Sequence, residues 1–267
     1  MQSSEQNIIF SYVLGEFILN TTQFLVAWLY LNISDMKKIL TLLLITNVFL
    51  GYSQCENGFF PFREGVKIEM TSYDKKDKEQ GKSINEVMLV DGSTAQVNSE
   101  IYDKKGELIS EGSFEVICED NVIKMDFKNF VPEELINQYE NMEVTVEGDY
   151  INIPADLEVG QDLKEGSGKM TMDMSGGSGL NMTNEIKLTF KDRKVTARET
   201  IETPAGTFET FKVEQLMITE MEMMGMSQTS ETSSITWYAE EVGAVRTENY
   251  NKKGKLTGYS LLTDYSD

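Results

Sequence analysis

Residues 186–191 read Ile-Lys-Leu-Thr-Phe-Lys, and this stretch decides the fold class. Its apolar side chains recur at every second position, and polar side chains stand between them. Alternate side chains of an extended strand point to opposite faces, so the stretch predicts a β-strand with one buried and one solvated face. Strands of this kind are typical of antiparallel sheets that are wet on one side.

The same alternation recurs along the chain from Gly65 onward. It is found in residues 66–71, 123–127, 143–147 and 211–214. We therefore expect an all-β fold, an antiparallel meander of about a dozen short strands. Strand twist should roll such a meander into a curved sheet, a half-barrel or a barrel.

Turn residues separate these strands. Residues 103–107 (Asp-Lys-Lys-Gly-Glu) and 251–255 (Asn-Lys-Lys-Gly-Lys) each supply an Asx residue and a glycine suited to a hairpin. Asp91-Gly92 predicts a two-residue turn. Residues 203–207 (Thr-Pro-Ala-Gly-Thr) place Pro second and Gly fourth, as in a type I turn. One short helix is expected over residues 131–141, and a mobile loop over residues 175–179.

The first 53 residues depart from this pattern. Residues 36–53 begin Met-Lys-Lys, continue with an apolar run from Ile39 to Leu50 and end in small residues. This order predicts a secretory signal peptide cleaved after Ser53. Residues 1–35 are interpreted either as a misannotated extension before a start at Met36 or as a membrane anchor. Residues 54–267 are expected to form a single antiparallel β domain located in the periplasm, on the outer-membrane surface or outside the cell.

Charge and histidine content exclude several functions. The 267-residue chain has 24 Lys and Arg against 44 Asp and Glu, a net charge of −20, and it has no histidine. Such an acidic surface repels nucleic-acid phosphates and gives no attraction to anionic lipid headgroups, so we predict no nucleic-acid partner. Without histidine the chain cannot build Ser-His-Asp or Cys-His nucleophiles, nor the common His-based zinc and copper sites.

Cys55 and Cys118 are the two cysteines of the chain. In an exported protein they most simply form one disulfide, and two free thiols are the alternative. A bond that closes a loop of about 64 residues would stabilise the fold by about 4 kcal/mol in the chain-entropy description. Cys55 could instead carry a lipid, but Gln54 stands where a lipoprotein signal requires a small residue.

Residues 203–213, Thr-Pro-Ala-Gly-Thr-Phe-Glu-Thr-Phe-Lys-Val, resemble the hallmark hairpin of a bacterial family known as domain of unknown function 3108, which includes TapB-like proteins. The similarity continues through Trp237-Tyr238-Ala239, Val242-Gly243 and residues 250–256. It also includes Cys55, Phe60-Pro61 and Gly65. This resemblance covers most of residues 55–262 and implies an exported, largely antiparallel β protein of the Bacteroidetes type. It implies no catalytic residues, and residues 1–35 depart from its pattern.

Motifs for catalysis are missing or incomplete. Gly81-Lys82-Ser83 matches the end of a phosphate-binding loop, but Lys76 stands where its first glycine is required. Gly168-Lys169 is followed by Met170 and so lacks the hydroxyl that reaches magnesium. The sequence has neither a Gly-x-Ser-x-Gly motif nor calcium-loop spacing. A paired-carboxylate enzyme stays an alternative, although no pair stands out. We expect neither catalysis nor a cofactor.

Methionine is the unusual residue type, with 15 in the chain. Two clusters carry most of them: Met170, Met172, Met174 and Met182, and then Met217, Met221, Met223, Met224 and Met226. Residues two apart on a strand share a face, so each cluster predicts a stripe of thioethers. The stripes suit an irregular core, a deformable cavity for a lipid-like ligand, or a Cu(I) site. The candidate lining residues are Met170, Met172, Met174, Met182, Met221 and Met223.

These observations predict a non-catalytic exported protein that binds an apolar, lipid-like ligand or another envelope component. A methionine-rich Cu(I)-binding periplasmic protein is the first alternative. A structural or interaction module without a ligand is the second.

Overall fold

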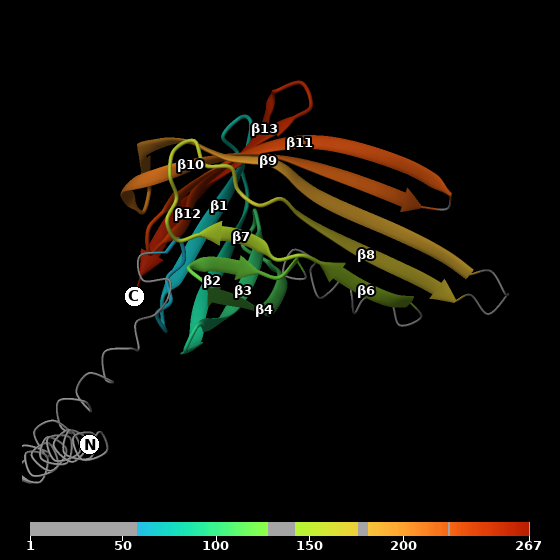
Figure 1. The fold of residues 1–267 in the computed structure, drawn as a ribbon, viewed down its shortest axis with the longest axis horizontal. Coiled ribbons are helices and arrows are strands. Elements are labelled where there is room, and N and C mark those ends of the chain that lie inside the picture. The colour runs from blue at the N-terminus through green and yellow to red at the C-terminus, as the bar shows by residue number, and fades with distance from the viewer. Residues whose placement is uncertain (1–57, 128–141, 176–180, 224, 267) are drawn as a thin grey trace, which may run out of the picture. The chain divides into compact units, whose positions relative to one another are not determined.

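The computed structural model describes residues 58–127, 142–175, 181–223 and 225–266 (Figure 1). These residues form one antiparallel sheet of 13 strands, in the order β6-β8-β9-β10-β11-β12-β13-β1-β2-β3-β4-β5-β7. The expected all-β antiparallel class is confirmed. The strands are β1 (Lys67–Asp74), β2 (Glu79–Asp91), β3 (Thr94–Asp103), β4 (Leu108–Glu119), β5 (Val122–Met125), β6 (Met142–Gly148), β7 (Ile151–Pro154), β8 (Gly166–Ser175), β9 (Asn181–Thr203), β10 (Gly206–Met223), β11 (Met226–Ala239), β12 (Gly243–Asn251) and β13 (Leu256–Ser266).

The sheet is curved but not closed (Figure 1). Its two edge strands, β6 and β7, pair with β8 and β5 but not with each other. The barrel among the expected shapes is therefore wrong, and the curved open sheet is the form adopted. The segment that follows β7 turns back onto β9, where the Gly160 and Leu163 amides donate to the carbonyls of Val195 and Arg193 at 2.8 and 2.7 Å. This loop links the β7 edge to β9, which is the third strand from the opposite edge.

The core consists of three groups of buried side chains. In the first, Val195 of β9 and Val213 of β10 pack with Val97, Val116 and Ile123 of β3 to β5. Curvature of the sheet thus brings strands that are far apart in its order into contact. A second group joins β1, β2, β11, β12 and β13, with Val66, Val87, Val245 and Leu262 nearly inaccessible to solvent. Each such side chain contributes about 2 kcal/mol by leaving water.

The hairpin between β9 and β10 packs onto the second group. Thr203 pairs with Gly206, which has a φ of +144°, so Pro204 and Ala205 form the tip, as the sequence predicts. The Ala205 amide donates to the Leu262 carbonyl at 3.4 Å, and Phe208 packs against the buried residues below. The residues that carry the family resemblance at this point therefore have a structural role.

Three other hairpin tips share one design. Asp74, Asp103 and Asn251 each end a strand, and each side chain accepts backbone N–H bonds from the residues two and four positions later, at 2.7–3.2 Å. A left-handed residue follows in each tip, with φ between +60° and +80°. The predicted turns at 103–107 and 251–255 are confirmed. At the β2–β3 hairpin, Asp91 pairs with Thr94, so the two-residue loop is Gly92-Ser93 rather than Asp91-Gly92.

Strands β8 to β11 continue beyond the packed part of the sheet and, with β6, form an extension that we call the arm (Figure 1). The arm comprises residues 142–148, 166–175, 181–191, 216–223 and 226–233. Phe127 anchors its base, because the ring is 1% exposed and lies against Gly148 and Gly168, which pair with each other. A Cβ atom on Gly168 would lie 2.1 Å from atoms of this ring.

Several expectations lie outside the described residues. These are the signal peptide at 36–53, the extension at 1–35, the helix at 131–141 and most of the loop at 175–179. Within the described part of the chain, no helix has the length and apolar character needed to cross a membrane.

Gly168→Ala tests the anchor of the arm. The added methyl group must displace the Phe127 ring, so we expect unfolding to become easier by about 2 kcal/mol in urea denaturation. Gly112→Ala in β4 is the matched control, because a Cβ there meets no atom within 4 Å. Its stability should change by less than about 0.5 kcal/mol. Equal stability of the two variants would contradict the packing of Phe127 on Gly168.

Candidate functional site

The two methionine stripes lie on one face of the arm. Met170 of β8 pairs with Ile186 of β9, and Ile186 in turn pairs with Met221 of β10. Directly paired residues of neighbouring strands point to the same face. Met217 pairs with Phe190 by the same rule. The stripes therefore share a face, and apolar side chains of β9 lie between them.

Solvent exposure along this face increases away from the core. Met170 and Phe190 are each 7% exposed, whereas Met223 and Met226 are 47% and 72% exposed. The side chains between these limits are half-buried. We give the name methionine face to six residues, which are Met170, Met172, Ile186, Leu188, Met217 and Met221. This surface is only partly covered by the rest of the protein.

The opposite face of the arm is charged. Lys169 pairs with Glu185 across β8 and β9 at 3.6 Å, and Lys187 pairs with Glu220 across β9 and β10 at 3.5 Å. Exposed ion pairs of this kind add little stability, but they keep that face in water. The arm is therefore amphipathic.

The register places few methionines directly beside one another. Met170 and Met221 are separated by Ile186, a distance of two strand spacings or about 10 Å between backbones. Met172 pairs with Asn184 rather than with another thioether. Met174 pairs with Met182 in the backbone ladder, although their side chains lie outside the described residues, and Met223 pairs with Met226. Two-methionine pairs at the end of the arm do not by themselves supply three converging sulfurs for Cu(I).

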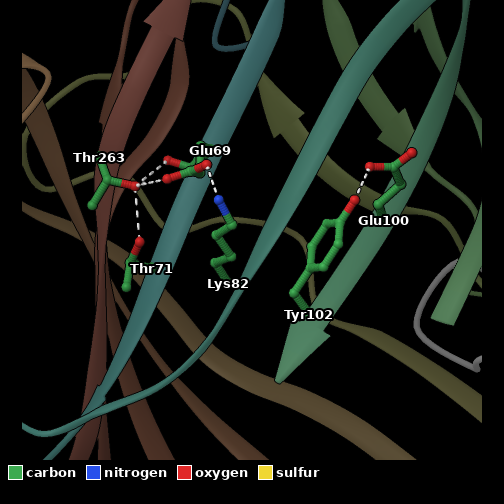
Figure 2. Close-up of polar contacts among 6 residues, drawn as sticks. All are labelled: Glu69, Thr71, Lys82, Glu100, Tyr102 and Thr263. Carbon is green, nitrogen blue, oxygen red and sulfur yellow. Dashed lines mark hydrogen bonds and ion pairs between the residues drawn. The ribbon is translucent and has the colours of Figure 1, made fainter. Parts of the chain in front are cut away.

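A polar cluster lies across β13, β1 and β2 (Figure 2). The Lys82 Nζ donates to Glu69 Oε2 at 2.7 Å, and the Thr263 hydroxyl donates to Glu69 Oε1 at 2.9 Å. The register shift between Glu69 and Met70 leaves Thr263 without a strand partner, beside Glu69. Lys82 is the main cause of a lowered pKa of Glu69, opposed by desolvation and assisted by Thr263. The carboxylate is therefore held in its charged form.

Two tyrosines, each the next-to-last residue of a strand that leads into a hairpin tip, donate to the glutamate two positions earlier. Tyr102 donates to Glu100 at 2.6 Å (Figure 2), and Tyr250 donates to Glu248. The bond to Glu248 raises the pKa of Tyr250 to about 12. These phenols stay protonated at neutral pH and are unsuited to act as bases or nucleophiles.

Arg246 contacts both Glu248, the partner of Tyr250, and the ring of Trp237. Its Nε donates to Glu248 at 3.0 Å, and its guanidinium lies 5.4 Å from the Trp237 ring centre. Trp237 donates through Nε1 to Glu199 at 2.5 Å. An open depression of about 340 Å³ lies nearby and is lined by Glu214, Leu216, Ile235 and Tyr250, among others. Every charged group named here already has a partner within the sheet.

Arg193 is the most buried charged side chain named here, with 3% exposure. It donates to the Lys164 carbonyl at 2.6 Å and to Gln215 at 3.1 Å. Burial lowers the pKa of this guanidinium. Because its partners are on the loop after β7 and on β10, Arg193 holds that loop against the sheet.

Cys118 lies in the first core group, is 1% exposed and is not a free thiol. Its predicted partner, Cys55, lies outside the described residues, so the Cys55–Cys118 bond stays a prediction. Within the described ranges no three His, Cys, Asp or Glu side chains gather in a way that could hold a metal ion.

Sequence reasoning missed the polar clusters and the third Asx tip. Tyr73-Asp74-Lys75-Lys76 repeats the order of residues 102–105 and 250–253, in which Tyr and an Asx residue precede two lysines. This repeat could have been found by eye. The Glu69–Thr263 contact could not, because its two residues are far apart in the chain.

The family model for DUF3108-like proteins matches residues 63–262. The chain belongs to the DUF3108-like family, which confirms the resemblance seen in the sequence. A structure described as an exported protein with a YmcC-like fold, from Bacteroides fragilis, is 23% identical with a TM-score of 0.59, over 79% of this chain and 100% of the other. A structure described as a lipoprotein, from Parabacteroides distasonis, is 25% identical with a TM-score of 0.60, over 79% and 99%. A comparison with curated proteins found no match.

The family is one of unknown function, and these descriptions support an exported, envelope-associated location for this chain. They assign no ligand and no reaction.

Glu69→Gln tests the polar cluster. A lowered pKa in the folded state means that Glu69 adds stability above its unfolded pKa of about 4.3, and that this contribution is lost as the pH falls. We expect the variant to be less stable than the wild type by about 1 kcal/mol at pH 7, with a difference that shrinks toward pH 3. Urea unfolding across this range measures it. Glu79→Gln is the control, and a Glu69→Gln effect that did not depend on pH would contradict the assignment.

The predicted disulfide is tested by alkylating the denatured, exported protein before and after reduction. We expect neither cysteine to react until a reductant is added. Cys118→Ala should then leave Cys55 open to alkylation without reduction. Labelling of both cysteines in the unreduced wild type would rule out the bond.

Proposed function

We propose that this protein is a non-catalytic binding protein of the cell envelope, which holds an acyl chain against the methionine face of the arm. The observation that carries the proposal is that apolar side chains dominate this face while most of it is only half-buried. Thioether side chains are flexible and polarisable, so they adapt to an apolar ligand without one fixed shape.

The dimensions of the methionine face suit a chain-like ligand. From Met217 to Met221 the strand rises about 13 Å, and the face spans β8, β9 and β10. Each methylene group of a ligand that leaves water on such a surface gains about 0.8 kcal/mol. Contact along a strand therefore provides useful affinity without an enclosed cavity. An open sheet has no barrel lumen, so the face takes the place of the cavity that the sequence suggested.

The absence of reactive groups from this face favours binding over catalysis. The six side chains of the methionine face are thioethers and hydrocarbons, and their polar partners in the register of β8 to β10 are Asn184 and Thr219. The polar clusters described above lie outside the arm, with their carboxylates already bonded. We do not propose Cu(I) binding, because among the methionine side chains that the structure describes the register pairs only Met223 directly with Met226, which leaves out a third sulfur.

Fluorescent fatty-acid titration tests the proposal. The double variant Met217→Gln, Met221→Gln keeps the side-chain length and adds polarity at the centre of the face. We expect its affinity for the probe to fall about tenfold, since two apolar contacts of roughly 0.7 kcal/mol each are lost. Met88→Gln is the matched control, because Met88 is 56% exposed on β2, away from the arm.

Equal affinity of the double variant and the control would contradict binding at this face. If the wild type failed to bind the probe at all, the arm would instead be an interaction surface without a lipid ligand.

A further inference from the structure

Lysines are concentrated in three hairpin turns at one end of the strands of an otherwise acidic sheet. The three Asx tips, residues 74–79, 103–107 and 251–255, hold one third of the chain's 24 basic residues and only five of its 44 acidic ones. The lysines are Lys75, Lys76, Lys78, Lys104, Lys105, Lys252, Lys253 and Lys255. The five carboxylates are Asp74, Asp77, Glu79, Asp103 and Glu107. The tips are therefore net positive on a strongly negative protein.

The sheet order places these tips side by side. Strands β12, β13, β1, β2, β3 and β4 are consecutive antiparallel neighbours. The three hairpins therefore close at the same end of these strands. Gly258, beside the tip at residues 251–255, pairs with Asp74 of the tip at residues 74–79. Gly81, beside the tip at residues 74–79, pairs with Asp103 of the tip at residues 103–107. Adjacent tips are two strand spacings apart, about 10 Å. We name these eight lysines and their turns the lysine rim.

The lysines of the rim are available to an external partner. All eight are exposed. Lys252 pairs with Glu231 at 2.9 Å, and the other seven form no ion pair with any residue that the structure describes. The Asx residues are turned inward to the turn amides instead, and these bonds lower the pKa values of Asp74 and Asp103. Those two carboxylates are thus occupied by backbone amides of the turns.

Apolar side chains stand beside the rim. At the β3–β4 tip, Leu108 is 51% exposed and Ile109 is 61% exposed, and Ile101 on the paired strand is 39% exposed. Tyr73, Tyr102 and Tyr250 each directly precede a tip, and Tyr73 stacks on Tyr259 with ring centres 5.1 Å apart. Lysine, tyrosine and exposed aliphatic side chains are the types found where a protein meets a bilayer surface.

We propose that the lysine rim docks this protein onto an anionic membrane surface, with the lysines on the headgroup phosphates and Leu108 and Ile109 packing against the same surface beside them. Protruding tips in a row meet a flat surface end-on, whereas a linear polyanion is better held in a groove. Lysine is a compact, flexible point charge that suits a diffuse phosphate layer. The net charge of −20 obscures this surface, because it averages the rim with acidic residues elsewhere. This inference is independent of acyl binding by the arm.

Vesicle co-sedimentation tests the proposal with the exported, processed protein. We compare phosphatidylcholine vesicles with vesicles of equal parts phosphatidylcholine and phosphatidylglycerol. The wild type should bind the anionic vesicles at least tenfold more tightly, and added salt should weaken this binding. An N-terminal anchor or an acyl-binding arm would bind both vesicle types alike, so the difference between them reports on the rim.

Matched variants locate the binding surface. Lys104→Glu with Lys105→Glu should reduce binding to anionic vesicles at least tenfold. Lys164→Glu with Lys191→Glu makes the same charge change at exposed lysines away from the tips and should cost less than threefold. Leu108→Ser with Ile109→Ser keeps the charge and should reduce binding about fivefold. Similar losses in the two charge-reversed variants, or equal binding to both vesicle types, would overturn the proposal. So would dextran sulfate binding the rim more tightly than vesicles do.

Discussion

The long hairpin of β9 and β10 is the element on which the rest of the structure depends. Its backbone ladder runs from Gly206 paired with Thr203 to Glu222 paired with Glu185. One end buries Val195 and Val213 in the core, and the other end carries Ile186 and Met221 into the arm. A single cooperative ladder thus connects the packed part of the protein to the part with an incompletely covered apolar face. This continuity fixes the arm to the packed part of the sheet.

The same sheet carries its two distinctive surfaces at different positions. The arm separates apolar from charged residues between its two faces, because alternate residues of each strand face opposite ways. The lysine rim arises differently, from three turns at the same end of neighbouring strands. Two surfaces of opposite chemistry therefore occur on one sheet. In our two proposals the rim meets a bilayer and the arm holds a lipid chain.

Much of the local structure could be predicted from the sequence, because it depends on neighbouring residues. Alternation at 186–191 identified a strand, and the Asx-Lys-Lys-Gly pattern at 103–106 identified a hairpin tip with its left-handed glycine. The methionine stripes were recognised by spacing alone. Their common face was not established, since it depends on β9 lying between β8 and β10. The sheet's open edges were also beyond prediction, because closure depends on whether the first and last strands in its order meet.

The remaining differences have similar causes. The β2–β3 turn shifted by one residue because register, rather than the Asp-Gly pair, sets which residues are unpaired. The cradle of Phe127 on Gly168 joins two residues from different hairpins, and nothing local signals it. Composition was misleading in one respect, since a net charge gives no information about where the lysines lie.

Native mass spectrometry of the protein purified from its own host tests most directly whether the arm holds an apolar ligand. We expect a mass above that of the bare processed chain, with the extra mass released by organic solvent and identified as a lipid-like molecule. A chain that carries nothing, from cells grown and lysed under gentle conditions, would contradict it.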